Sequence, residues 1–141
     1  FLDPGIPPSG GVGLVSTKSD YSHFLSMLAG GGHWGGVRCL MPDNVRQMTS
    51  NHLTAGQFPV RFAHPWPGMG YGFGVGVQTD HLPGAGWPAG TFGWIGISGV
   101  RAWVFPQESA SIIALPQAQF YFEPADTFQK LAYEALVAER C

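Results

Sequence analysis

The chain has 141 residues, which suits one domain with a substantial hydrophobic core. Only 11% of its residues are charged and 45% are hydrophobic, a composition too apolar for a disordered chain. The net charge of −2 comes without a cluster of Lys or Arg, which argues against a nucleic-acid partner. Composition therefore predicts a single folded unit over residues 1–141.

Membrane and metal signals are weak in this sequence. No apolar run reaches the roughly 18 residues that a membrane-spanning helix needs, and residues 1–4 lack the basic and apolar regions of a signal peptide. We therefore expect a soluble protein, with the cytoplasm and the periplasm both open as compartments. Cys39 and Cys141 form neither a disulfide framework nor a metal-ligand pattern, so no metal or cofactor is predicted and Cys39 is expected in the core.

The first part of the chain predicts an irregular lead-in and a helix. Residues 1–13 are rich in proline and glycine and suit a surface segment. The stretch from Thr17 to Asp20 has the form of a capping box, in which Thr17 accepts from the Asp20 amide and Asp20 reaches back. The helix should end at the glycines over 30–32. Its apolar stripe is expected in the core, not in catalysis, and consists of Tyr21, Phe24, Leu25 and Leu28.

The middle of the chain predicts loops around a short helix. Residues 33–36 are expected to form a loop, and Pro42 suits the first position of a helix reaching about Ser50. The inner face of that helix should carry Val45 and Met48. Residues 51–67 are expected to be irregular, with Trp66 as the rim of a pocket or as a packed loop anchor.

Glycines alternate with apolar residues over 68–79. This pattern predicts one strand with an apolar face and a bare face that another element or a ligand approaches. A glycine- and proline-rich loop over 80–90 follows and carries Trp87. The loops with Trp66 and Trp87 are expected to shape a pocket, in which these two rings would suit an apolar acyl or alcohol group.

Residues 91–105 predict a hairpin with its turn at Ser98-Gly99. Gly96 would leave neighbouring amides uncovered, so an edge strand here could present N–H groups to a substrate oxygen, as an oxyanion hole requires. The alternative is a purely structural glycine-rich strand under an aromatic layer.

The last elements are a strand and a helix. A turn over 106–109 leads to a strand over 110–115, expected to be fully buried and the third of an antiparallel meander. Pro124 marks a helix start, and the helix should pack across one face of the sheet. Its apolar stripe is Phe128, Leu131, Ala132, Ala135 and Leu136. The predicted fold class is α+β, with helices flanking an antiparallel sheet.

Common catalytic motifs do not occur in the sequence. It has no Gly-x-Ser-x-Gly, no phosphate loop, no His-Glu-x-x-His and no Cys/His cluster. Its lysines are Lys18 and Lys130, and neither follows a serine at the spacing of Ser-x-x-Lys.

Several short motifs nevertheless resemble the serine β-lactamase-like superfamily, in the order found there. The resemblance is nearest to class C β-lactamase-like esterases, including the family VIII-type carboxylesterases, and to penicillin-binding-protein relatives. It spans nearly the whole chain but only the C-terminal part of such a protein. The segments that carry it are Ser9–Thr17, Asp20–Phe24, Leu40–Pro42, Met48–Leu53, Gly70–Gly74 and Gly93–Gly96.

The resemblance implies a catalytic cleft along the hairpin. The family's third motif is Lys-Thr-Gly in β-lactamases and Trp-x-Gly or His-x-Gly in many esterase-like members, and here it falls on Trp94, Ile95 and Gly96. The backbone amide of Ile97 would then be one oxyanion donor, and the amide of the nucleophilic serine would be the other. Trp94 replaces the lysine that would hold a β-lactam carboxylate, which favours ester hydrolysis or acyl transfer over penicillin hydrolysis.

The family's nucleophile and bases lie in Ser-x-x-Lys and in Tyr-x-Asn or Tyr-x-Ser, which this chain lacks. The resemblance therefore implies an incomplete fold that needs a complementary N-terminal chain or segment carrying Ser-x-x-Lys, with sheet strands beside residues 110–115. The expected substrate is a small-molecule ester or amide. The alternatives are a D-Ala-D-Ala peptidase or β-lactamase, and a non-catalytic homologue that serves binding or assembly.

Overall fold

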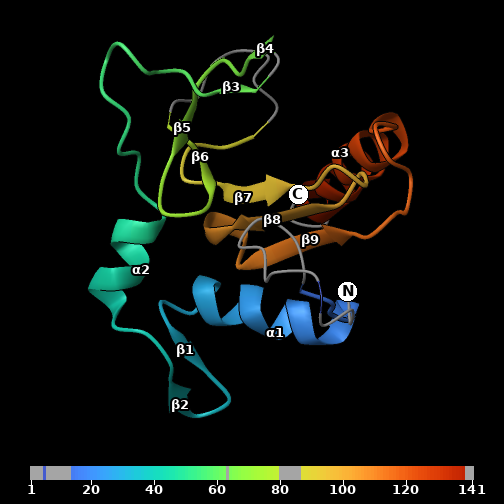
Figure 1. Cartoon of the computed structure of the whole chain (residues 1–141). Helices are drawn as coiled ribbons and strands as arrows, with labels where there is room; N and C mark the ends of the chain where they lie inside the picture. The colour runs from blue at the N-terminus through green and yellow to red at the C-terminus, as the bar shows by residue number, and fades with distance from the viewer. Residues whose placement is uncertain (1–4, 6–13, 63, 80–86, 139–141) are drawn as a thin grey trace.

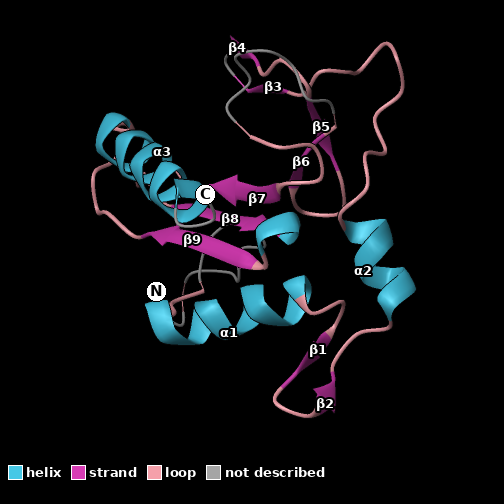
Figure 2. Cartoon of the chain, turned by 180° about the vertical axis from the view of Figure 1, so that it is seen from behind, coloured by secondary structure: helices cyan, strands magenta, loops and turns pink. Residues whose placement is uncertain are grey.

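The computed structural model describes residues 5, 14–62, 64–79 and 87–138 (Figure 1). The remaining residues include most of the lead-in over 1–13, the loop over 80–86 and Cys141, so the expectations for them lie outside the described part. A five-stranded antiparallel sheet with the strand order β5-β6-β7-β8-β9 forms the centre of the molecule. Helices α1 and α3 lie on its opposite sides (Figures 1 and 2). The predicted α+β fold with helices flanking an antiparallel sheet is confirmed.

Helix α1 spans Lys18–Ala29 and begins as predicted. The hydroxyl oxygen of Thr17 accepts from the amide of Asp20 at 3.1 Å, and the same hydroxyl donates to the Asp20 carboxylate at 2.9 Å. The helix ends at Gly30, followed by two glycines with positive φ. Leu25 and Leu28 are buried as expected, whereas Phe24 is exposed and Met27 is buried instead.

Two small hairpins replace predicted loops. Strands β1 (His33–Trp34) and β2 (Val37–Arg38) pair across Gly35 and Gly36, which both have positive φ, as a two-residue hairpin turn requires. Cys39 follows β2 and is exposed, so its expected place in the core is wrong; this hairpin projects away from the sheet (Figure 2). Strands β3 (Arg61–Phe62) and β4 (His64–Pro65) interrupt the stretch expected to be irregular.

Helix α2 spans Pro42–Met48, with Pro42 at its start and Val45 buried, as predicted. It ends two residues before the expected boundary at Ser50. The side chain of Met48 packs against the core on the α1 side of the sheet.

Residues 68–79 form two strands, not one. Strands β5 (Met69–Tyr71) and β6 (Gly76–Gln78) pair antiparallel. The chain reverses because the Gly72 amide donates to the Val75 carbonyl at 2.8 Å and Gly74 has a φ of +82°. A Cβ on Gly72 would collide with the carbonyl oxygen of Met48. These glycines therefore make a turn and a close backbone approach, which mimics the alternation of a strand.

Strands β7 (Phe92–Ile95) and β8 (Arg101–Phe105) form the predicted hairpin, with Trp94 opposite Ala102. The turn at Pro106–Glu108 leads to β9 (Ala110–Ala114), as expected. However, β9 is mostly half-buried, because it lies at the edge of the described sheet. Only its Ile112 is fully buried, so the prediction of a fully buried strand is wrong.

Helix α3 spans Glu123–Ala138 and packs against β8 and β9 as predicted, with an inner face that matches the predicted stripe only in part, at Ala132 and the half-buried Leu136. Phe128 and Leu131 are exposed, whereas Ala125 and Gln129 are buried. The inner face instead includes Tyr133, whose ring stacks on Phe105 at 4.7 Å between centroids.

Two hydrophobic clusters hold the layers together. The cluster on the α1 side joins α1, α2 and the sheet through Leu25, Met27, Leu28, Val45, Val77, Phe92, Ala102 and Val104. The cluster on the α3 side consists of Met69, Trp103, Phe105 and Ile112, with Ala132 and Tyr133 of α3 packed against it. Because successive side chains of a strand point to opposite faces, residues of β8 alternate between the two clusters.

Candidate active site

The turn between β7 and β8 is closed by two backbone hydrogen bonds. The Gly96 amide donates to the Val100 carbonyl at 2.9 Å, and the Gly99 amide donates to the Gly96 carbonyl at 3.0 Å. Gly99 has a φ of +85°, which favours glycine. Ile97 and Ser98 are therefore the two central residues of a tight β-turn.

This turn directs the Ile97 amide away from the hairpin. The Gly96 carbonyl points inward to accept from Gly99, and in a planar trans peptide the N–H of the next residue points the opposite way. Within the described residues, the Ile97 N–H donates no hydrogen bond. The Ile97 side chain is 53% exposed. An unused backbone donor thus stands at the outer side of the turn.

Near this donor, the neighbouring strand β6 does not cover the edge of β7. Strand β6 pairs with β7 at Gly93 and Phe92, and the described pairing ends there. Because the Gly96 amide is turned toward β8, the amide of Ile95 faces the other edge under the alternation of an antiparallel strand. The carbonyl oxygen of a ligand could therefore approach this edge without displacing a strand.

Trp94 belongs to an aromatic group beside that edge. Its ring meets Tyr71 edge-on at 4.8 Å between centroids and Trp66 at 5.9 Å. The sequence placed Trp66 and Trp94 in one pocket, and the structure brings them together. Tyr71 was missed as their partner, because its place opposite Gly76 depends on the β5–β6 turn.

The other predicted pocket residues lie elsewhere. Ile95 packs against the cluster on the α3 side, opposite to the face of Trp94. The ring contacts of Trp87 within the described residues are edge-on to Phe105 at 5.3 Å and to Tyr133 at 5.4 Å. Trp87 thus packs between β8 and α3 instead of beside Trp94.

An apolar cavity of about 230 Å³ opens on the α1 side of the sheet, next to Trp94. Its wall is formed by α1, the end of α2, the β5–β6 turn and the β7–β8 strands. The lining residues are Tyr21, Phe24, Leu25, Leu28, Met48, Phe73, Gly74, Val75, Phe92, Gly93, Trp94 and Ala102. Burial raises the pKa of the Tyr21 phenol above its ordinary value of 10.0 through desolvation. The phenol is therefore neutral near pH 7 and unsuited to act as a base there.

Among the described residues, no three His, Cys, Asp or Glu side chains gather in a way that could hold a metal ion. In the same part of the chain, no helix is both long and apolar enough to cross a membrane.

Comparison with solved structures places this architecture. EstCE1, described as a hydrolase with promiscuous acyltransferase activity, matches 86% of this chain with a TM-score of 0.69 and 30% identity. A candidate β-lactamase from Bacteroides dorei DSM 17855 matches 94% of the chain with a TM-score of 0.56 and 17% identity, a likeness of fold alone. The chain has a β-lactamase-like fold. It covers 30% and 44% of these two β-lactamase-like chains, respectively.

Two curated relatives of this chain come from Mycobacterium tuberculosis. Protein Rv1367c of strain H37Rv and the uncharacterized protein MT1414 of strain CDC 1551 are each 40% identical to it over 121 residues. The aligned part is 77% of this chain and 29% of each relative, so the chain spans less than a third of their length. No model of a known protein family matches the chain.

Proposed function

We propose that this chain supplies the cleft strand and one oxyanion donor of a serine hydrolase that acts on carboxylic esters. The observation that carries the proposal is the unused Ile97 amide, which points outward at the end of the strand that bears Trp94. The likeness to EstCE1, a hydrolase with promiscuous acyltransferase activity, supports hydrolysis or acyl transfer as the reaction class.

The reaction would proceed through an acyl-serine. A base takes the proton of a serine hydroxyl as the serine oxygen attacks the ester carbonyl carbon, and the carbonyl oxygen becomes an oxyanion that accepts from the Ile97 N–H. The alcohol leaves with a proton delivered by the base, and the acyl group remains on the serine. Water or a second alcohol then attacks the acyl-serine, releasing an acid or a new ester. In this scheme the chain itself contributes the Ile97 donor and the Trp94 wall.

The serine and its bases must come from outside the residues of this sequence, which has no Ser-x-x-Lys. We place them on a complementary segment that docks on the α1 side of the sheet. One observation favours this face: its apolar cavity has the exposed rings of Phe24 and Phe73 in its wall. The chain spans only 29% of its curated relatives, which supports a complementary segment but not its position. Burying such apolar surface would stabilise the assembly.

Esters are favoured over β-lactams because of Trp94. It stands in an aromatic group with Tyr71 and Trp66, where an apolar acyl or alcohol group would fit and where a β-lactam carboxylate would lack a cation. A D-Ala-D-Ala peptidase is the alternative within the hydrolases. The absence of Ser-x-x-Lys favours a second candidate function of another class, a non-catalytic binding or assembly protein.

Hydrolysis of a p-nitrophenyl short-chain ester tests the proposal. The chain is assayed alone and together with a complementary segment carrying Ser-x-x-Lys, with a serine-to-alanine version of that segment as the control. We expect turnover only in the assembly with the intact serine, and labelling of the complementary segment by a serine-directed phosphonate. An assembly that forms but neither hydrolyses the ester nor takes the label would support the binding function instead.

A further inference from the structure

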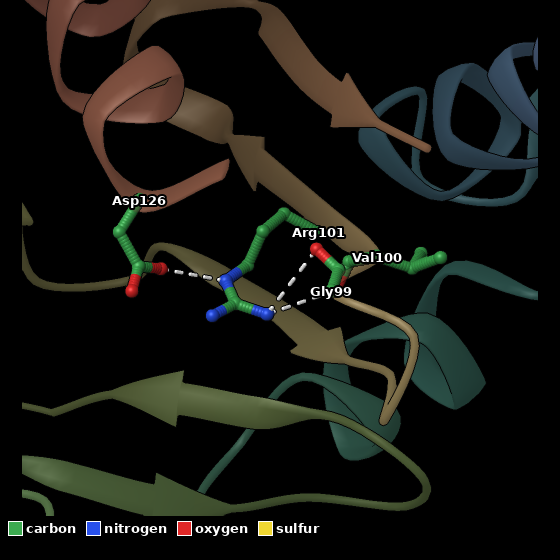
Figure 3. Close-up of polar contacts among 4 residues, drawn as sticks. All are labelled: Gly99, Val100, Arg101 and Asp126. Atoms are coloured by element: carbon green, nitrogen blue, oxygen red, sulfur yellow. Dashed lines mark hydrogen bonds and ion pairs between the residues drawn. The ribbon is translucent and has the colours of Figure 1, made fainter. Parts of the chain in front are cut away.

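Arg101, the first residue of β8, carries a buried charge next to the turn. The residue is 4% exposed, and removing a guanidinium from water is costly unless partners compensate. Its Nε donates to the carboxylate of Asp126 at 2.7 Å, and its Nη1 donates to the Val100 carbonyl at 3.1 Å and, more weakly, toward the Gly99 carbonyl at 3.5 Å (Figure 3). The guanidinium carbon also lies 5.0 Å from the ring centre of Phe122.

These contacts join the turn to the start of α3. Asp126 lies in the first turn of that helix, and Phe122 immediately precedes the helix. The Arg101 side chain therefore contacts both the carbonyls at the end of the turn and the first turn of α3.

Backbone hydrogen bonds from the segment between β9 and α3 hold the rest of the turn. The Ala118 amide donates to the Ser98 carbonyl at 3.1 Å, and the Phe120 amide donates to the Ile97 carbonyl at 3.0 Å. The carbonyls of residues 97–100 are thus held from the segment after β9 and from Arg101, while the Ile97 amide is left unused. These contacts fix the direction of the Ile97 N–H without using it as a donor.

We infer that Arg101 is a positioning residue for the oxyanion donor of Ile97. The inference rests on the proposed function. An oxyanion donor acts only if it is held in place before the oxyanion develops, to within about 0.5 Å. The buried Arg101 acts through the turn: its guanidinium contacts the Val100 carbonyl and is itself held by Asp126 of α3. A residue with a merely structural role in attaching α3 would affect stability but not the rate constant of the chemical step.

The test compares Arg101→Gln, Arg101→Lys and Asp126→Asn with wild type in the active assembly. Arg46→Gln is the matched control, because Arg46 forms an exposed ion pair with Asp43 at 2.8 Å on α2. We expect Arg101→Gln to lower kcat about tenfold or more with KM within about twofold, since an oxyanion contact is stronger in the transition state. The lysine variant should recover part of the loss, Asp126→Asn should cost less, and Arg46→Gln should match wild type.

Amide hydrogen exchange provides a second measurement that does not need activity. The amides of Gly96 and Gly99 close the turn, so both should exchange faster in Arg101→Gln and Asp126→Asn than in wild type or Arg46→Gln. If wild type hydrolyses no ester, the proposed function fails, while the exchange rates still test the Arg101 contacts. If Arg101→Gln does not fold, Asp126→Asn decides, because it weakens the ion pair that holds the guanidinium while Arg101 itself stays in place.

The inference would be overturned by folded Arg101→Gln with wild-type kcat, or by unchanged exchange at Gly96 and Gly99 in both variants. It would also be overturned if KM rose while kcat stayed constant, since that pattern indicates lost ground-state binding instead of a displaced oxyanion donor.

Discussion

Replacing Ile97 with proline would remove the proposed oxyanion donor and little else. Proline has no N–H, and its fixed φ suits the second residue of a β-turn, the position that Ile97 occupies between Gly96 and Gly99. The residue before a proline is restricted, but Gly96 is the least hindered residue for that position. Because the Ile97 amide donates no hydrogen bond among the described residues, none of those bonds is lost.

The expected effects on catalysis and stability differ by several-fold in free energy. Loss of one oxyanion donor typically lowers kcat about 10²–10³-fold, or about 2.7–4 kcal/mol of transition-state stabilisation. The Ile97 side chain is 53% exposed, so its truncation costs little burial. Proline at a compatible position stabilises by about 0.4–1 kcal/mol through the unfolded chain, which offsets that cost. The free energy of unfolding should therefore change by less than about 1 kcal/mol.

The assay is p-nitrophenyl ester hydrolysis by the assembly, with urea unfolding measured in parallel. Ile97→Ala is the control, since it removes the same side chain but keeps the amide. We expect Ile97→Ala to stay within about threefold of wild-type kcat, whereas the proline variant loses about two orders of magnitude or more. A folded Ile97→Pro assembly with kcat close to that of Ile97→Ala would refute the role of this amide.

Three further predictions concern neighbouring residues. A Cβ at Gly93 would collide with the Ala102 carbonyl oxygen, whereas one at Gly96 would lie 3.3 Å from the Val100 Cβ. Gly93→Ala should therefore lower the free energy of unfolding in urea by about 3 kcal/mol, and Gly96→Ala by about 1 kcal/mol or less. Equal losses in the two variants would contradict this packing. The raised pKa of the buried Tyr21 phenol means that the unfolded chain loses its proton first. Wild type should thus lose stability relative to Tyr21→Phe as pH rises above about 10, with a constant difference in melting temperature below pH 9, and parallel curves throughout would argue against the shift. Trp94→Lys should lower the free energy of unfolding by about 1 kcal/mol per aromatic contact. It should also shift the substrate preference of the assembly toward β-lactams with a carboxylate, and an unchanged substrate profile would count against a cleft at Trp94.

Elements encoded by short-range patterns could be predicted from the sequence. Helix α1 begins at Thr17 because its cap needs only a side chain three residues from its partner, and the β7–β8 hairpin follows from two apolar runs around a Ser-Gly turn. The position of the candidate site also came from the sequence, since the resemblance of residues 93–96 pointed to this strand. The catalytic role of that strand stays a prediction.

Tertiary contacts decided what local patterns left ambiguous. Gly72 is a glycine because Met48 approaches it from another element, and the resulting turn divides residues 68–79 into two strands. The inner face of α3 is set by which of its residues meet β8 and β9, so Ala125 is buried while the larger Phe128 is exposed. Likewise, nothing local to Arg101 indicates that Asp126, 25 residues away, will hold its charge. Local sequence patterns reflect interactions between residues close together in the chain, whereas packing and ion pairing depend on which distant segments the fold brings together.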